Sequence, residues 1–549
     1  MNPPRRPRAV KVTAWVMVAV LVGSAAALAL TALRGEEEIG DPGRLSETLH
    51  DWTADSAALP VLTDVTADWG LTGVLTTGSH PLRGGAAVAD LDGDGRNDIV
   101  VAGGRLHILM ARPAGGFEPV AATGSLLSDN DAGEAVSVAL SDVDGDGRVD
   151  IMVGTTGAHS LVVWGGDWST VTGSRDATDA EVTTIDGGRP TTAVVPADLD
   201  GDGVTDLLRL GYGGTDPRPD LVLRQDPDDR RSFDTGIELP DSRRLSLAAE
   251  VVDIDGDGLV DLWVTRDTGW ATGPDSVYSR EGDPTGPWRD IAPALGADQA
   301  IDGMGVTVGD LTGDGNLDVY LSDLGDNELL TRSITGRGFI PVFGAGVGRI
   351  RPPGGSDREV SSSWGSGMAD LNLDGRFDLV VVNGGFADNS MINKIPGSEV
   401  VLDDPPAVFL GLGDGTFSDV WPRLGLAWEG SSRGLSIGDL DSDGDPDLVI
   451  VNHDGQVRVY RNDTPTAGVT LRLDPACPAA GSYLRVESGV GSAAVRLGGR
   501  SFAGHHAPEV SLPRDSGRSS TTLIVPGRPP AEVPPPPVGG PPVVDLPCP

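Results

Sequence analysis

Aspartates recur along this sequence at a spacing that suits binding of a hard cation. The nine-residue pattern D-x-[DNT]-x-D-G-x-x-D occurs seven times, at intervals of 52 to 69 residues, with copies beginning at Asp90, Asp142, Asp198, Asp253, Asp310, Asp370 and Asp439. Side-chain oxygens at positions 1, 3, 5 and 9, with a backbone carbonyl at position 7, can surround one Ca²⁺ at about 2.3–2.6 Å. All copies have Gly at position 6, where the sharp turn leaves no room for a Cβ. We number these copies loops 1 to 7 and predict that they bind up to seven Ca²⁺ ions.

The expected ligands differ slightly between the loops. Loops 1 to 4 have Asp at every side-chain position, whereas Thr312 in loop 5 and Asn372 in loop 6 keep an oxygen but lose a charge, which predicts weaker binding. In loop 7 Asp445 holds the carbonyl position, and we expect its side chain to point to solvent. In chain order the expected ligands are Asp90, Asp92, Asp94, Arg96, Asp98; Asp142, Asp144, Asp146, Arg148, Asp150; Asp198, Asp200, Asp202, Val204, Asp206; Asp253, Asp255, Asp257, Leu259, Asp261; Asp310, Thr312, Asp314, Asn316, Asp318; Asp370, Asn372, Asp374, Arg376, Asp378; Asp439, Asp441, Asp443, Asp445 and Asp447.

The alternative is that these segments are Asx-type turns that need no metal. We favour a cation because clustered carboxylates repel one another and no basic residue lies regularly beside them in the sequence. A flexible cage made only of oxygens suits Ca²⁺ better than Mg²⁺. The loops lack the Glu at position 12 of an EF-hand, which predicts structural sites filled by extracellular calcium.

Strand-like segments surround each loop. Small and apolar residues precede it, as in residues 85–89, and a β-branched run such as Ile99-Val100-Val101 follows directly. A third apolar stretch comes next, then a fourth element with an aromatic residue, such as Phe417-Ser418-Asp419-Val420. Four strands in about 55 residues are typical of a propeller blade. The sequence therefore predicts an all-β, seven-bladed β-propeller with calcium loops between strands 1 and 2 of each blade.

The first strand-like segment predicts how the repeats close. Leu62-Thr63-Asp64-Val65 is similar to Phe417-Ser418-Asp419-Val420 but has no blade before it, and the seventh repeat ends without a fourth strand. We expect the N-terminal segment to complete the last blade, which leaves no open sheet edge.

The composition excludes some function classes. The net charge of −40, from 81 acidic and 41 basic residues, argues against nucleic acid as a partner because phosphates would be repelled. The 39% of hydrophobic residues, which recur in short strand-like runs, argue against a disordered chain.

The N-terminus predicts export. Arg5, Arg6, Arg8 and Lys11 precede an uncharged run at residues 12–33. Its 22 residues suit an uncleaved membrane anchor, and small residues at 24–27 leave a cleaved signal peptide open. In either case the positive residues before the run place the rest of the chain outside the cytoplasm.

The remaining chain divides into a linker at 35–60 after the signal or anchor at 1–34, repeats at 61–463, a small β-rich region at 464–525 and a Pro-rich tail at 526–549. We expect this stretch to be an extended tail or linker and not part of a folded domain. The two cysteines, Cys477 and Cys548, could form one disulfide or remain separate thiols.

The repeats resemble the FG-GAP/VCBS repeats of integrin α-subunit propellers. The arrangement is more specifically similar to the cartilage acidic protein family with its ASPIC/UnbV tail. The resemblance rests on the seven loops, Leu62-Thr63-Asp64-Val65 and Val459-Tyr460-Arg461-Asn462-Asp463, with Tyr483-Leu484-Arg485-Val486 and Ala494-Val495-Arg496-Leu497 for the tail. It implies a calcium-bound propeller used in extracellular interaction and no established catalytic activity.

Two insertions predict a ligand face. Residues 348–363 and 383–405 fall on the face opposite the calcium loops, and they carry Arg349, Arg351, Arg358, Asn389, Asn393 and Lys394 in a chain short of positive charge. Tolerated surface insertions are the alternative.

The leading hypothesis for the function is a surface module that binds an extracellular protein or glycan. A propeller enzyme acting on extracellular polysaccharide and a structural envelope or assembly protein are the alternatives, and no catalytic constellation was found for the enzyme.

Overall fold

The computed structural model describes residues 58–549 except for 75, 122, 129, 167–179, 187–190, 213–217, 281, 285, 334–337, 343, 349–358, 386–398, 454, 476, 478–479, 489–490, 515–519 and 537–538. The expected signal or anchor at 1–34 and most of the linker lie outside the described residues. Within the described part of the chain, no helix has the length and apolar character needed to cross a membrane.

The described chain is all-β, with four short helical segments, namely α3 (Thr123–Ser128), α4 (Gly269–Thr272), α5 (Ala292–Leu295) and the 3-10 helix η2 (Trp421–Arg423). Each repeat forms four antiparallel strands. In chain order these are β2 (Gly85–Ala89), β3 (Asp98–Gly103), β4 (Arg105–Ala111), β5 (Phe117–Pro119); β6 (Ala135–Ser141), β7 (Asp150–Thr155), β8 (His159–Val163), β9 (Val182–Asp186); β10 (Thr191–Ala197), β11 (Asp206–Gly211), β12 (Leu221–Leu223), β15 (Ile237–Glu238); β16 (Ser246–Val252), β17 (Asp261–Arg266), β18 (Ser276–Ser279), β19 (Arg289–Asp290); β20 (Gly305–Gly309), β21 (Asp318–Ser322), β22 (Glu328–Arg332), β23 (Phe339–Pro341); β25 (Ser363–Ala369), β26 (Asp378–Asn383), β28 (Ala407–Gly411), β29 (Phe417–Asp419); β30 (Ser432–Gly438), β31 (Asp447–Asn452) and β32 (Val457–Asn462) with β1 (Leu62–Asp64).

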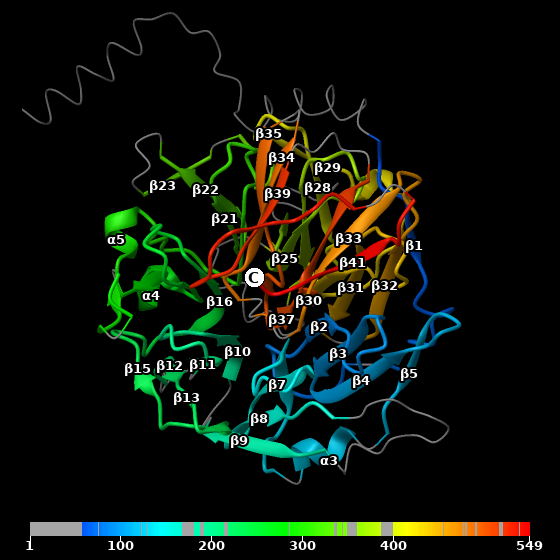
Figure 1. Ribbon diagram of the computed structural model, residues 1–549. Helices are drawn as coiled ribbons and strands as arrows, with labels where there is room; N and C mark the ends of the chain where they lie inside the picture. The colour runs from blue at the N-terminus through cyan, green and yellow to red at the C-terminus, as the bar shows by residue number, and fades with distance from the viewer. Residues whose placement is uncertain are drawn as a thin grey trace, which may run out of the picture. The chain divides into compact units, whose positions relative to one another are not determined.

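The first strands of these sheets follow one another in contact. β2 contacts β6, and the contacts continue through β10, β16, β20, β25 and β30 back to β2 (Figure 1). The second strands, such as β3 and β7, are buried along their whole length because another sheet packs on each face. This explains why their sequences are continuous β-branched runs instead of alternating ones.

The predicted pairing of the N-terminal segment with the last repeat is confirmed. β1 pairs antiparallel with β32, and Leu62 lies opposite Asn462. The sheet of β30, β31 and β32 thus receives its fourth strand from a segment about 400 residues earlier in the chain.

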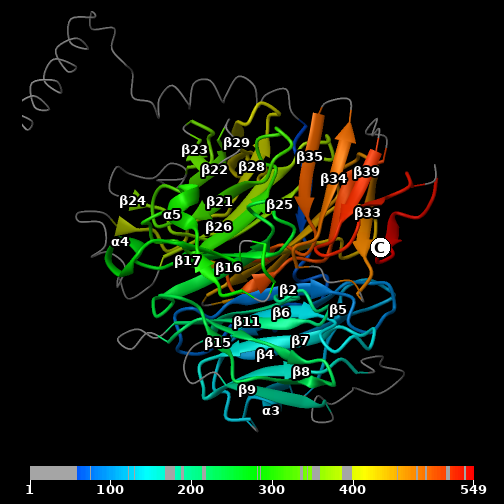
Figure 2. The same ribbon diagram turned by 60° about the vertical axis from the view of Figure 1, so that its left-hand side comes forward.

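The C-terminal region forms two further sheets. One contains β33 (Gly468–Leu473), β38 (Glu509–Pro513) and β41 (Val543–Leu546), and the other contains β34 (Tyr483–Ser488), β35 (Gly491–Arg496), β39 (Ser520–Ile524) and β40 (Ala531–Glu532). Figure 2 shows β34, β35 and β39 side by side. We call residues 464–549 the C-terminal module.

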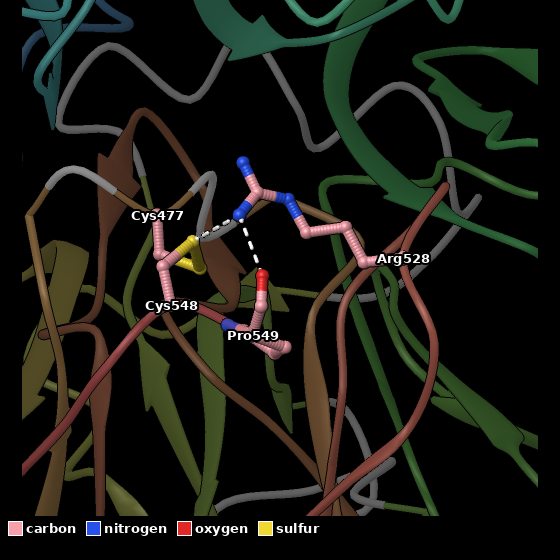
Figure 3. The surroundings of a disulfide bond; sticks show 4 residues. All are labelled: Cys477, Arg528, Cys548 and Pro549. Atoms are coloured by element: carbon pink, nitrogen blue, oxygen red, sulfur yellow. Dashed lines mark hydrogen bonds between the residues drawn. A yellow bond between two sulfur atoms is a disulfide. The ribbon is translucent and has the colours of Figure 1, made fainter.

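The expectation that 526–549 is an extended tail is wrong. β40 pairs with β39, and β41 pairs parallel with β33, so the Pro-rich stretch between them connects two strands. Cys477 and Cys548 form a disulfide that closes a loop of 71 residues (Figure 3). Arg528 Nη1 lies 2.8 Å from Cys548 Sγ and 3.0 Å from Pro549 O, which holds the chain end against the module.

A hairpin of the C-terminal module lies among the first strands of the repeats. It consists of β36 (Arg500–Ser501) and β37 (Gly504–His505), and β37 pairs parallel with β2 at Ala87 and His505 (Figure 1). β36 contacts β16, β20, β25 and β30, while β37 contacts β2, β6 and β30. A Cβ on Gly85 would lie 2.1 Å from Ala503 O, so the small residues of the first strands allow this close approach.

Buried polar contacts fix the hairpin. Glu250 Oε1 lies 2.7 Å from Arg496 Nη2, and Glu250 Oε2 accepts the Arg500 N–H at 3.0 Å. His506 Nδ1 accepts the Ile437 N–H at 3.1 Å, which assigns the proton to Nε2, 3.0 Å from Ser366 O. Phe502 packs edge-on against Trp364, with ring centroids 4.9 Å apart.

Candidate metal centre

The seven loops connect the first and second strands of their sheets, as predicted. In every loop the aspartate at position 9 is the first residue of the second strand, for example Asp98 in β3 and Asp447 in β31. The loop therefore projects from a buried sheet, and its ligands are positioned by the end of one strand and the start of the next.

The aspartate at position 1 closes each loop on itself. In loop 1, Asp90 Oδ1 accepts the Gly93 N–H at 2.8 Å and Oδ2 accepts the Gly95 N–H at 2.8 Å. The bond from the position 6 Gly recurs in all seven loops, with acceptors Asp90, Asp142, Asp198, Asp253, Asp310, Asp370 and Asp439. These bonds direct the carboxylate into the loop.

The aspartate at position 9 joins the loop to the sheet. In loop 1, Asp98 Oδ2 accepts the Leu91 N–H at 2.9 Å and Oδ1 accepts the Ala111 N–H of β4 at 2.7 Å. The residue is buried in all seven loops. Burial raises the pKa of Asp150, Asp206 and Asp261 to about 7 and that of Asp318 to about 6. Ionising these carboxylates inside the fold is costly unless a cation or donor compensates the charge.

The backbone N–H at position 7 donates to the carboxylate at position 5 in every loop. Arg96, Arg148, Val204, Leu259, Asn316, Arg376 and Asp445 each donate to Oδ1 of the aspartate two residues earlier, at 2.8 to 3.2 Å. This bond sets the turn that carries the position 7 carbonyl. Its role as a ligand stays a prediction.

Carboxylate oxygens come together in five of the loops. Groups of three lie within 4.8 Å of one another at Asp90, Asp92, Asp94; Asp142, Asp144, Asp146; Asp198, Asp200, Asp206; Asp253, Asp255, Asp261; and Asp439, Asp441, Asp447. Among the described residues, loops 5 and 6 provide no such group. These are the loops in which Thr312 and Asn372 replace the position 3 carboxylate. The weaker binding expected there stays a prediction. Oxygen donors alone at this spacing suit Ca²⁺.

Position 4 of each loop has a left-handed backbone conformation, which the sequence analysis did not predict. It is Gly with φ between 73° and 81° in loops 1 to 5, but Leu373 and Ser442 occupy it with φ of 52° and 61° in loops 6 and 7. A left-handed conformation at a residue with a Cβ costs about 1 kcal/mol. The signal was present in the sequence, since five of the seven copies have Gly there.

Basic residues lie near some of the loops in three dimensions, although none lies regularly beside the loops in the sequence. Arg231, from the hairpin of β13 (Gln225–Asp226) and β14 (Asp229–Phe233), lies 2.7 Å from Asp144 and 3.7 Å from Asp146 of loop 2. Arg280 and Arg332 interact electrostatically with the carboxylates of loops 3 and 4. Both arginines follow or end the third strand of the next sheet, so they are distant from those loops in the sequence.

The expected solvent exposure of Asp445 is also wrong. Its side chain is 4% exposed, because the C-terminal module covers loop 7. Burial and the neighbouring Asp443 raise its pKa to about 9.

The two insertions of the predicted ligand face meet at their ends. β24 (Glu359–Val360) pairs parallel with β27 (Glu399–Val400), which brings residues from both insertions side by side. Arg349, Arg351, Arg358, Asn389, Asn393 and Lys394 lie outside the described residues.

Comparison with known proteins agrees with the repeat architecture. The FG-GAP-like repeat family matches residues 90–153, 142–208, 253–321 and 370–450. Cartilage acidic protein 1 of Homo sapiens is 24% identical over 296 residues, covering 49% of this chain and 40% of that protein. The Xenopus tropicalis protein is 24% identical over 309 residues, covering 51% of this chain and 42% of that protein. The matched part is thus about two fifths of the length of these relatives.

Among solved structures, an Agrocybe aegerita lectin described as recognising non-reducing terminal N-acetylglucosamine is 19% identical, with a TM-score of 0.39, covering 69% of this chain and 94% of the lectin. A structure of BBS1N in complex with ARL6DN is 12% identical, with a TM-score of 0.40, covering 75% of this chain and 99% of that chain. The chain carries FG-GAP-like repeats, and it resembles cartilage acidic protein 1.

Proposed function

We propose that this chain is an exported, calcium-loaded β-propeller of seven blades that serves as a surface interaction module. The observation that carries the proposal is the repeated group of three carboxylates within 4.8 Å in five of the loops. Seven four-stranded units whose first strands contact one another in turn support the propeller. Calcium would compensate the charge of carboxylates whose pKa is raised by burial, and so stabilise the start of each second strand.

Calcium binding is tested by counting the ions. The full chain, dialysed against buffer with a fixed free Ca²⁺ concentration, should retain several calcium ions per chain by mass spectrometry of the metal. Loops 1 to 4 and 7 should fill first in a titration, because loops 5 and 6 have fewer carboxylates. A chain that retains no calcium would contradict the proposal.

Two features support the interaction role. The insertions that pair at β24 and β27 add local structure to one repeat. The hairpin of β36 and β37 occupies the space among the first strands, which is where an active site of the enzyme alternative would lie. Function in propellers commonly lies on such inserted loops. Export, through the N-terminal segment as anchor or cleaved signal, is part of this proposal because millimolar calcium is extracellular.

The partner is best sought with an array of glycans and extracellular proteins, probed with the full chain with calcium and with EGTA. A true partner on the array should bind the chain in calcium and not in EGTA. Its binding should weaken when Arg349, Arg351 and Arg358 are replaced together by Ala. Binding that is unchanged in this triple variant would remove the proposed ligand face. The matched control replaces Arg224 and Arg243, which form exposed ion pairs elsewhere, and should leave binding unchanged.

A further inference from the structure

Two arginines of the C-terminal module are buried where the module meets the first strands of the repeats. Arg496, at the end of β35, and Arg500, in β36, are each 7% exposed. The carboxylate that contacts both residues is that of Glu250 in β16, 2.7 Å from Arg496 Nη2 and 3.0 Å from the backbone nitrogen of Arg500. Arginine stays protonated in proteins, so this group carries two positive charges and one negative charge.

Part of the donor capacity of these arginines is unused. Arg496 Nε and Nη1 are buried and have no hydrogen-bond partner among the described residues. Arg500 Nη2 donates to Val194 O at 3.2 Å, and a carbonyl offers no full negative charge. Burial lowers the pKa of Arg500 to about 10, with Glu250 opposing this shift and Arg496 adding to it. A buried charge without a counter-charge is unfavourable, so the group needs one more negative charge.

The neighbouring histidines do not change this balance. Burial lowers the pKa of both His505 and His506, which keeps the two rings neutral. His505 Nε2 lies 2.7 Å from Gly498 O, and His506 Nε2 lies 3.0 Å from Ser366 O. Each ring thus has a backbone partner within the fold and supplies no counter-charge.

A cavity of about 40 Å³ adjoins both guanidinium groups. Strands β20, β25 and β30 line one part of it, and Arg496, Arg500 and His506 line another. One water molecule needs about 10–15 Å³ by the same measure, so the cavity has room for a small ion. The unused N–H groups and the room for an acceptor therefore occur at the same place.

Two further carboxylates line this cavity, but both have other partners. Glu509 pairs with Arg472 at 2.8 Å. Asp439 is an expected ligand of loop 7, and its Oδ2 accepts the Thr470 hydroxyl at 2.8 Å. Among the described residues, Glu250 is the carboxylate that acts on the charge of Arg500.

We propose that this cavity binds a small monovalent anion, either chloride or a carboxylate of the size of formate, between Arg496 and Arg500. The anion would accept the unused N–H groups of Arg496 and neutralise the excess positive charge. It would thereby stabilise the hairpin of β36 and β37 among the first strands. The site is separate from the seven loops, so the proposal does not depend on calcium binding.

Thermal melting of the full chain in three sodium salts tests the site. Sodium chloride or sodium formate replaces sodium gluconate in steps, at constant ionic strength and constant free Ca²⁺ concentration. Gluconate is too large for the cavity and controls for screening of surface charges. We expect the melting temperature to rise by about 2 degrees for each tenfold increase of the bound anion above its dissociation constant. Chloride alone or formate as well as chloride identifies the shape of the anion, and equal melting in all three salts would contradict the site.

The substitution Arg500→Met assigns the response to this cavity. Methionine keeps the unbranched side chain but removes the charge, which leaves Arg496 and Glu250 as a neutral pair. The melting temperature of this variant should no longer respond to chloride more than to gluconate. Arg243→Met, which breaks an exposed ion pair with Glu238, is the matched control and should keep the full response. A response that persists in Arg500→Met would contradict the site.

Anomalous diffraction supplies a readout that does not depend on variant folding. Crystals of the wild-type chain are grown with bromide as the small anion. A bromide peak beside Arg496 and Arg500 supports the proposal, whereas a cavity that holds water alone overturns it.

Discussion

The seven loops and the hairpin of β36 and β37 stabilise the same sheets through different kinds of contact. Each loop is closed by bonds among nine consecutive residues, such as Asp90 to Gly93 and Gly95. The hairpin is held by bonds to distant residues, such as Arg500 to Glu250, 250 positions earlier. The loops hold each sheet at its own edge, whereas the hairpin touches the first strands of many sheets at once. Loss of one loop should therefore be a local change, and loss of the hairpin contacts should affect all repeats.

The largest loss of stability is expected from replacing Glu250, which holds the hairpin of β36 and β37. Glu250→Ala removes the ion-pair partner of the buried Arg496 guanidinium and the acceptor of the Arg500 backbone N–H. Breaking a buried ion pair typically costs about 3–5 kcal/mol of unfolding free energy. Urea unfolding measures the loss. Glu238→Ala is the control, since its ion pair with Arg243 is exposed and should contribute less than about 1 kcal/mol. Equal losses in the two variants would refute the central role of the hairpin.

A smaller loss of stability is expected when one loop is altered, and its size should depend on which loop is changed. Asp206→Asn in loop 3 and Asp318→Asn in loop 5 both alter a position 9 carboxylate that accepts a backbone N–H. Each should cost about 1–3 kcal/mol from the disturbed hydrogen bonds. With calcium, Asp206→Asn should lower the melting temperature more than Asp318→Asn, because loop 3 has the converging carboxylates. The difference should shrink in EGTA, and a difference that persists unchanged in EGTA would not be due to the metal.

The pH dependence of stability should disappear with calcium. The folded-state pKa of Asp150, Asp206 and Asp261 is raised to about 7, so without calcium the fold retains protons that the unfolded chain has lost above about pH 4. Their contribution to stability is complete below the unfolded pKa and is lost as the pH rises through 7. Melting in EGTA between pH 5 and 8 should therefore show a falling melting temperature. With calcium the carboxylates are held ionised, and the fall should disappear.

The smallest stability effect is expected for Arg231→Ala. This arginine is partly exposed, and its ion pairs with loop 2 should contribute less than about 1 kcal/mol. The same change should raise the calcium affinity of loop 2, because Arg231 competes with the cation for Asp144. Calorimetric titration of the variant against the wild type measures this, with Arg224→Ala as a control for an exposed ion pair outside the loops. Unchanged affinity would show that Arg231 does not compete.

The contrast between local and distant contacts also explains what the sequence could predict. The loops, the strands beside them and the pairing of β1 with β32 depend on short patterns that repeat, and each of these was predicted. The burial of Asp445, the approach of Arg231 to loop 2 and the strand β41 in the Pro-rich tail depend on which segments meet in space. Because each of these contacts occurs once, no repeated pattern marks it.

The hairpin shows this limit most clearly. The stretch from Arg500 to His506 contains one arginine and two histidines in an otherwise acidic chain, but nothing in it indicates that Glu250 is the partner of Arg500. The sequence does show the small residues of the first strands, and such residues indicate that another backbone segment approaches these strands closely. Only the structure identifies Ala503 as the group that approaches Gly85.

Thermal melting of the full chain with excess calcium and with EGTA tests the central claim most directly. A ligand at 100 times its dissociation constant stabilises a fold by about 2.7 kcal/mol per site, so several filled loops should raise the melting temperature by many degrees. We expect a large, reversible fall in EGTA that is restored by calcium and not by an equal concentration of magnesium. A melting temperature that is the same in calcium and in EGTA would contradict structural calcium in this chain.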